Sequence, residues 1–189
     1  MTTTKTKPTT TEKPIETLPS NPFVFEILEL ASKQRSNAKK IEVLKTYEHD
    51  SLKSVLIWNF DETVISLLPE GDVPYGNVEE QTVYSGTLSE NLTKEIGGGE
   101  SATAQDLNGR GKTSLRREYK NLYNFVQGGN GTLNTIRREM MFINLLQGLH
   151  PKEAEVLILT KDKKLTNKYK ISFENVKEAY PNIQWGGRS

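Results

Sequence analysis

Apolar residues recur at intervals of three and four along the first part of the chain, which predicts amphipathic helices. Asn21 followed by Pro22 is typical of a helix start, because asparagine caps free amides and proline suits the first helical position. A second helix is expected from Ser36 or Asn37 and a third from Asp50. The residues expected to face inward are Val24, Ile27, Leu28 and Ala31, then Ile41, Leu44 and Tyr47, then Leu52, Val55, Leu56 and Phe60.

The same spacing returns after residue 112 and predicts four more helices. They are expected to start at Ser114, Thr132, Pro151 and Ser172. The predicted fold is therefore all-α, with two helical halves whose short connections favour antiparallel packing. The residues expected to face inward are Leu115, Tyr119, Leu122 and Val126, then Leu133, Ile136, Met140 and Ile143, then Ala154, Leu157 and Ile158, then Phe173, Val176 and Ala179.

Three stretches lack this periodicity. Residues 1–20 are mostly Thr, Lys and Pro, and we expect a disordered tail, because so few apolar groups cannot offset the entropy lost on ordering. Residues 69–112 contain PEGDVPYG and GGGE, which favour a long loop with a short extended piece at Thr82–Tyr84. Residues 184–189 are expected to be flexible. The chain is thus predicted to hold one helical domain, residues 21–183, with the long loop inside it.

Charge is distributed unevenly, although the formal net charge of the chain is only +1. Residues 48–106 hold two Lys and Arg against twelve Asp and Glu, a net charge of −10, which makes the predicted loop acidic. Residues 107–189 hold fifteen Lys and Arg against seven Asp and Glu, a net charge of +8. Such an asymmetry indicates an electrostatic partner for the basic part, although solvated helix faces would have the same composition.

Few residues offer catalytic or metal chemistry. The chain has no cysteine, which excludes disulfides and thiolate metal sites and fits a reducing cytoplasm. His49 and His150 lack the spacing of metal ligands, so both are expected at helix ends or on the surface. The stretch NGRGKTS at 108–114 has Asp106 where a phosphate-binding loop needs glycine, and it is interpreted as a basic hinge. No apolar run is long enough to span a membrane.

Basic residues of the C-terminal half are the candidate binding residues. Adjacent pairs fall in separate predicted helices, and a lysine-rich run, KDKKLTNKYK, is expected to form a loop between two of them. Lysine and arginine along one surface would contact nucleic-acid phosphates, whereas cations at helix ends would only stabilise the helix dipole. The candidate DNA-binding residues are Arg116, Arg117, Lys120, Arg137, Arg138, Lys161, Lys163, Lys164, Lys168 and Lys170.

Two stretches resemble a known family. Residues 25–68, FEILELAS…VISLL, resemble the opening of tailed-phage ATP-dependent DNA ligases, in which an ILxxIAS helix precedes a Ser/Asn-capped helix, a Lys-x-x-x-Asp turn and a LeuLys-x-Val helix. The stretches LQGLHPKEAEVLILTKDKKL and ISFENVKEAYPNI are similar to the family's LLxSLSPEDAEVL and VSxxxVNKVWPGLI segments. The matching residues are Ile27, Leu28, Ala31, Ser32, Lys40, Val43, Leu44, Asp50, Leu52, Lys53, Val55, Leu146, Leu149, Pro151, Glu153, Ala154, Glu155, Val156, Leu157, Asp162, Ser172, Val176 and Pro181.

The resemblance implies the all-helical N-terminal domain of those ligases, which grips duplex DNA around a nick through backbone and minor-groove contacts. No Lys-x-Asp-Gly motif, the site of the adenylated lysine, occurs in the chain, so ligation is not expected. The family's glycine after the RDL stretch is replaced by the more basic KLTNKYK, which puts the geometry of a DNA-contacting loop in doubt. With LLPEGDVPY and NFVQGG, the chain also resembles an uncharacterised family of small proteins of large tailed phages.

These observations favour a non-catalytic DNA-binding accessory protein of phage replication, repair or transcription. Its expected partner is duplex DNA, with or without a nick, and no cofactor, metal, small-molecule substrate or membrane is expected. Its expected location is the cytoplasm of a host. The main alternative is a protein-interaction module that docks on a polymerase, a clamp or a host factor. A virion component is a further alternative, with no residue pattern in its favour.

Overall fold

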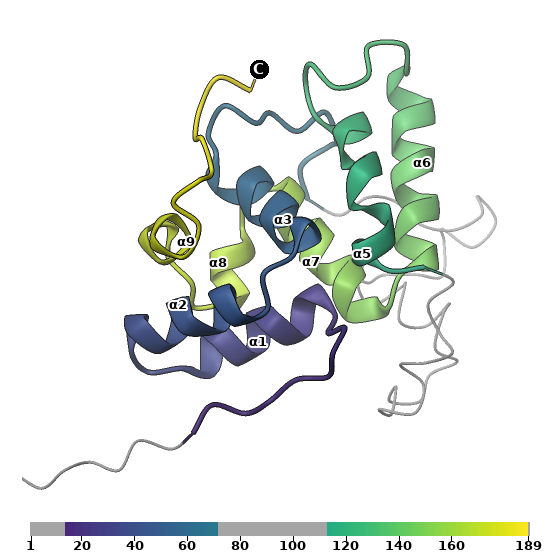
Figure 1. The fold of residues 1–189 in the computed structure, drawn as a ribbon. Coiled ribbons are helices and arrows are strands. Elements are labelled where there is room, and N and C mark those ends of the chain that lie inside the picture. The colour runs from purple at the N-terminus through teal and green to yellow at the C-terminus, as the bar shows by residue number, and fades with distance from the viewer. Residues whose placement is uncertain (1–13, 72–112, 189) are drawn as a thin grey trace, which may run out of the picture.

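The computed structural model describes residues 14–71 and 113–188, and these residues form an all-α fold, as predicted (Figure 1). No helix in the described ranges is long and apolar enough to cross a membrane. The elements, in chain order, are α1 (Val24–Lys33), α2 (Asn37–Thr46), α3 (Asp50–Phe60), α5 (Leu115–Glu118), the 3₁₀ helix η2 (Tyr119–Phe125), α6 (Thr135–Gly148), α7 (Pro151–Lys161), α8 (Leu165–Lys168) and α9 (Phe173–Ala179).

Local capping explains where most of these helices begin. The Ser36 hydroxyl accepts the Lys39 amide at the start of α2, and Ser172 does the same for Asn175 at α9. Helix α7 begins with Pro151, as expected. Two starts differ from the prediction by about one turn or less: α1 begins after Phe23 rather than Asn21, and α6 is capped by Asn134 rather than Thr132.

Both histidines stand at helix ends, as the sequence predicts. The Nδ1 atom of His49 accepts the Ser51 amide at 3.1 Å and caps α3. His150 caps α7 in the same way, with its Nδ1 accepting the Lys152 amide at 3.1 Å. No group of three or more metal-ligating side chains occurs within residues 14–71 and 113–188.

The two helical halves share one hydrophobic core. Helix α7 packs against α1, α3 and α6. Helix α9 packs against α2, on the side of the molecule opposite to α6 (Figure 1). The expected inward residues of α1, α2, α3 and α7 belong to this core, with Tyr47, Phe60 and Ile158 at its margin. Because α3 and α7 come from different halves and meet at the centre, neither half buries its apolar face alone.

A buried glutamate connects the halves at their helix starts. Glu153 of α7 is fully buried, and its two carboxylate oxygens accept the amides of Val24, at 3.3 Å, and Leu115, at 3.0 Å. These amides belong to the first residues of α1 and α5 and have no partner within their own helices. Burial raises the pKa of Glu153 to about 7, although the two amide hydrogen bonds and the Arg116 charge lower it.

Helix α6 presents a different face to the core from the one predicted. The pattern placed Ile136 and Met140 in the core, but these side chains are 72% and 59% exposed. That prediction was wrong because a core-facing position of α6 carries a charged residue, which a pattern of apolar residues assigns to the surface. The side chains that α6 buries instead are Arg138, Phe142 and Leu146.

Three other segments also differ from the expectation. In the N-terminal tail, the Leu18 amide donates to the Tyr47 hydroxyl at 2.8 Å. At the C-terminus, Trp185 contacts the Phe173 ring edge-on, with ring centroids 4.7 Å apart. The expected basic loop contains the end of α7 and the whole of α8.

Residues 1–13 and 72–112 lie outside the described residues, and so do most of the predicted acidic loop, Thr82–Tyr84 and the start of NGRGKTS.

Candidate functional site

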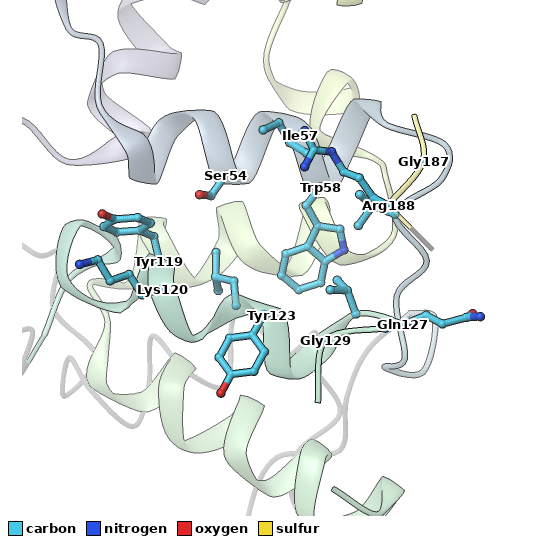
Figure 2. A pocket seen from close by; sticks show the side chains of 14 residues that line it. Ser54, Ile57, Trp58, Tyr119, Lys120, Tyr123, Gln127, Gly129, Gly187 and Arg188 are labelled. Atoms are coloured by element: carbon cyan, nitrogen blue, oxygen red, sulfur yellow. The ribbon is translucent and has the colours of Figure 1, made fainter. Parts of the chain in front are cut away.

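A groove opens between α3 and the helical segment formed by α5 and η2 (Figure 2). Its volume is about 510 Å³, within the range of pockets that enclose small ligands. Figure 2 shows Tyr119 and Lys120 at one end of the groove and Gln127 and Arg188 toward the other, with Trp58 between them. The lining is therefore aromatic and basic, and it contains no aspartate or glutamate of the described ranges.

Trp58 is held in a defined orientation at the bottom of this groove. Its Nε1 donates to the Ser66 hydroxyl at 2.7 Å, and that hydroxyl donates to the Lys161 carbonyl at 2.6 Å. The indole stacks on Phe125 with an interplanar angle of 9°. The Trp58 side chain of α3 is thus connected to α7 through the Ser66 hydroxyl and to η2 through the Phe125 ring, and Trp58 is only 3% exposed.

A short antiparallel pairing positions the turn after η2. Ser66 and Val126 form an isolated bridge, the Leu67 amide donates to Phe125, and the Gln127 amide donates to Ile65, both at 2.8 Å. The pairing holds the rim of the groove against the segment that follows α3.

The turn requires glycine at its end. A Cβ atom on Gly129 would lie 1.8 Å from the Tyr123 carbonyl oxygen, so no other residue fits there without moving the backbone. Gly128 has a φ of 79°, a conformation that other residues adopt at a cost. The sequence Gly128-Gly129 lies in the turn after η2 and sets the distance between this turn and Tyr123.

The C-terminal residues form the opposite rim and are tied to a buried carboxylate. Asp61 is 3% exposed and accepts the Gly186 amide at 2.9 Å and the Arg188 Nε at 3.1 Å. Although burial opposes its ionisation, hydrogen bonds from Thr63, Gly186 and Arg188 lower the pKa of Asp61 below its ordinary value. Arg188 is therefore held beside the groove by an ionised partner on its far side.

A family model matches residues 27–98 and 100–167, more than half of the chain, and its description is a family of unknown function, DUF6433. The chain belongs to the DUF6433 family. The matched DUF6433 ranges include Lys120, Tyr123 and Gly129 but not Arg188. None of the curated proteins and none of the solved structures shows significant similarity to the chain.

In this DUF6433 chain, three of the predicted DNA-binding cations serve as internal hydrogen-bond donors. Arg138 is 7% exposed, and its guanidinium donates to three carbonyls of the η2–α6 connection, at 2.9 to 3.2 Å. Lys161 is 2% exposed and donates to the carbonyls of residues 69 and 71 and to Asp162. Lys163 donates to the carbonyls of Trp58 and Asp61 at the end of α3. These donors are not available to phosphates in this structure.

Three more predicted cations have protein partners near the surface. Arg116 is half-buried, and its Nε donates to the Pro22 carbonyl at 2.9 Å. Lys164 pairs with Glu70 at 3.0 Å, and Lys168 pairs with Glu155. Exposed pairs of this kind exchange readily with solvent and other anions, so the two lysines keep part of their ability to bind phosphate.

The remaining predicted cations are exposed but are not gathered into one site. They are Arg117, Lys120, Arg137 and Lys170, and of these only Lys120 lines the groove. Sequence reasoning missed Arg188 because the tail was expected to be flexible. It placed Tyr119 in the core, and this side chain packs at the core margin and also lines the groove. The alternation of basic and aromatic residues in RREYKNLY, residues 116–123, is the signal that could have indicated this groove.

Proposed function

We propose that this chain is a non-catalytic DNA-binding accessory protein that acts in phage replication, repair or transcription, in the cytoplasm of a host. The observation that carries the proposal is the groove with Lys120 and Arg188 on its rim and no acidic side chain in its lining. The resemblance of the sequence to the helical DNA-binding domain of tailed-phage ATP-dependent DNA ligases supports the same function.

Phosphate contacts are the expected source of affinity. Arg117 and Lys120 are both exposed and lie three residues apart in one continuous helical segment, a spacing that places them on the same side of it. Lysine and arginine contacts to phosphates are independent of sequence and release counterions. Binding by these residues should therefore be weakly sequence-specific and strongly dependent on salt concentration.

The proposal is tested by titrating fluorescent duplex, nicked duplex and single-stranded DNA with the full chain at about 50 mM and about 200 mM salt. Lys120→Glu should weaken binding roughly tenfold. It should also reduce the slope of log affinity against log salt concentration by about one, because one phosphate contact is lost. Lys45→Glu is the matched control, because Lys45 is exposed on α2 and outside the groove, and the change in net charge is identical.

Two results would overturn the proposal. The first is the absence of binding to every DNA at low salt, which would favour a protein-interaction module instead. The second is an equal loss of affinity in Lys120→Glu and Lys45→Glu, which would show that DNA responds only to net charge and that the groove is not the contact.

A further inference from the structure

We infer that the groove receives an unpaired base of single-stranded DNA, stacked against Tyr123, with the flanking phosphates held by Lys120 and Arg188. This inference rests on the proposed function and deepens it, because it names the form of DNA that the groove takes. Four features of the described residues lead to it: the shape of the groove, its exposed aromatic side chains, its charges and its glycine rim.

The groove is concave and small. Proteins that read intact duplexes place a helix, a ribbon or an arm into a groove of the DNA, so their contact surface projects outward. The hollow between α3 and η2, of about 510 Å³, is open to solvent and can receive a group from outside. In single-stranded nucleic acid the bases can be splayed out and inserted into such a hollow, whereas in a duplex they are stacked on one another.

One aromatic side chain of the groove is largely accessible. Tyr123 is 51% exposed, and no other ring of the described residues stacks on it. Tyr119 is half-buried, meets His49 at 5.9 Å between ring centroids, and has the Lys120 Nζ over its ring, 5.9 Å from the centroid. Aromatic rings that leave a face open to solvent are typical platforms for unpaired bases, because every base offers a π-face.

The two cations of the groove lie toward its opposite ends. Lys120 is at one end and Arg188 toward the other, as Figure 2 shows, an arrangement that suits a base in the groove and a phosphate on each side of it. The hydrogen bond of Arg188 Nε to Asp61 fixes the guanidinium, and its Nη2 donates to the Gln184 carbonyl at 2.7 Å. The Arg188 side chain is 37% exposed and shares its charge with the Asp61 carboxylate, and a guanidinium held in this way loses little freedom when it binds a phosphate.

Two glycines lie on the rim next to Arg188 and Gln127. A Cβ atom on Gly187 would have no neighbour within 4 Å, and one on Gly128 would meet only the Arg188 carbonyl, at 3.9 Å. Both glycines have a positive φ, which explains the residue type, and the missing side chains leave the edge of the groove low. A strand can therefore cross the rim close to the backbone.

The inference is tested with the full chain and fluorescent DNA of one length, either a mixed-sequence single strand or the corresponding blunt duplex, at low salt. We expect the single strand to bind more tightly than the duplex. Tyr123→Leu should weaken single-strand binding about 5- to 100-fold and leave duplex binding unchanged, since one stacked base contributes about 1–3 kcal/mol. Tyr123→Phe keeps the ring and should restore single-strand binding.

The outcomes separate this inference from the proposed function. No binding to either DNA would overturn both. If both DNAs bind, and Lys120→Glu weakens the binding but Tyr123→Leu does not, the proposed function stands and the stacked base is overturned. Tighter binding of the duplex than of the single strand would have the same consequence. Circular dichroism of Tyr123→Leu should match that of the unsubstituted chain, because the ring is half exposed. A second duplex with a short single-stranded gap should bind like the single strand.

Discussion

Individual lysines in this chain have different roles even when they are neighbours. Lys161 is buried and donates to the carbonyls of Pro69 and Gly71, at 2.8 and 2.7 Å, and to Asp162. Lys164, three residues later, is exposed and pairs with Glu70. Sequence composition counts both as basic surface, but only Lys164 can meet a ligand with the loss of no more than an exposed ion pair.

This difference predicts unequal effects of the same substitution. Lys161→Met should lower the free energy of unfolding by about 2 kcal/mol, because three acceptors lose their donor while the aliphatic part of the side chain is conserved. Lys164→Met should leave it nearly unchanged, because exposed ion pairs contribute little. Urea unfolding followed by circular dichroism measures both, and equal effects of the two substitutions would show that Lys161 is not an internal donor in solution.

At the scale of helices, caps were easier to predict than orientation. Ser36, Pro151 and Ser172 mark helix starts by short-range hydrogen bonding or ring geometry, which the sequence displays directly. The orientation of α6 depends instead on contacts outside the helix, because Arg138 is satisfied by carbonyls of η2 and of the η2–α6 connection. No periodicity can show that a charged residue will find such partners.

The orientation of α6 predicts which of its residues matter for stability. Phe142 is fully buried and meets the Phe125 ring edge-on at 5.2 Å, so Phe142→Ala should lower the free energy of unfolding by about 3–5 kcal/mol. Ile136→Ser should change it by less than about 0.5 kcal/mol, because Ile136 is 72% exposed. Thermal and urea unfolding of the two variants provide the comparison. A larger effect for Ile136→Ser would mean that α6 faces the core as the apolar pattern predicts.

The candidate site could be predicted only in part, for the same physical reason. Lys120 was among the expected binding residues because it follows the basic pair Arg116-Arg117 in the sequence. Arg188 was not, because its position depends on the hydrogen bonds of the C-terminal residues to Asp61, about 125 residues earlier in the chain. The groove is a product of three segments that meet only in the folded molecule: α3, η2 and the C-terminal residues.

In the molecule as a whole, Glu153 connects the helical halves and makes stability depend on pH. Its pKa is about 7 in the folded chain and 4.5 for an unperturbed glutamate. Between these values the folded state retains a proton that the unfolded state has lost, so the free energy of unfolding falls as pH rises through this window. From pH 5 to pH 8 the contribution of Glu153 should fall by about 2–3 kcal/mol.

Glu153→Gln removes the titration of this carboxyl group. Comparison with the unsubstituted chain therefore separates its effect on stability from the effects of the other titratable groups. The difference in free energy of unfolding between the unsubstituted chain and the variant should therefore shift by about 2–3 kcal/mol between pH 5 and pH 8, in favour of the variant at high pH. His49 acts in the opposite direction, since burial and the Arg116 charge lower its pKa, but it is present in both proteins and its effect cancels in the difference.

Glu155→Gln is the matched control on the same helix, because Glu155 is half-buried and pairs with Lys168 rather than with helix amides. This variant should keep the pH dependence that Glu153 causes. A difference between Glu153→Gln and the unsubstituted chain that stays constant from pH 5 to pH 8 would mean that the carboxylate is ionised throughout. In that case the amides of Val24 and Leu115 would offset the cost of burying the charge, and the helix starts of the two halves would be joined by an anion at every pH.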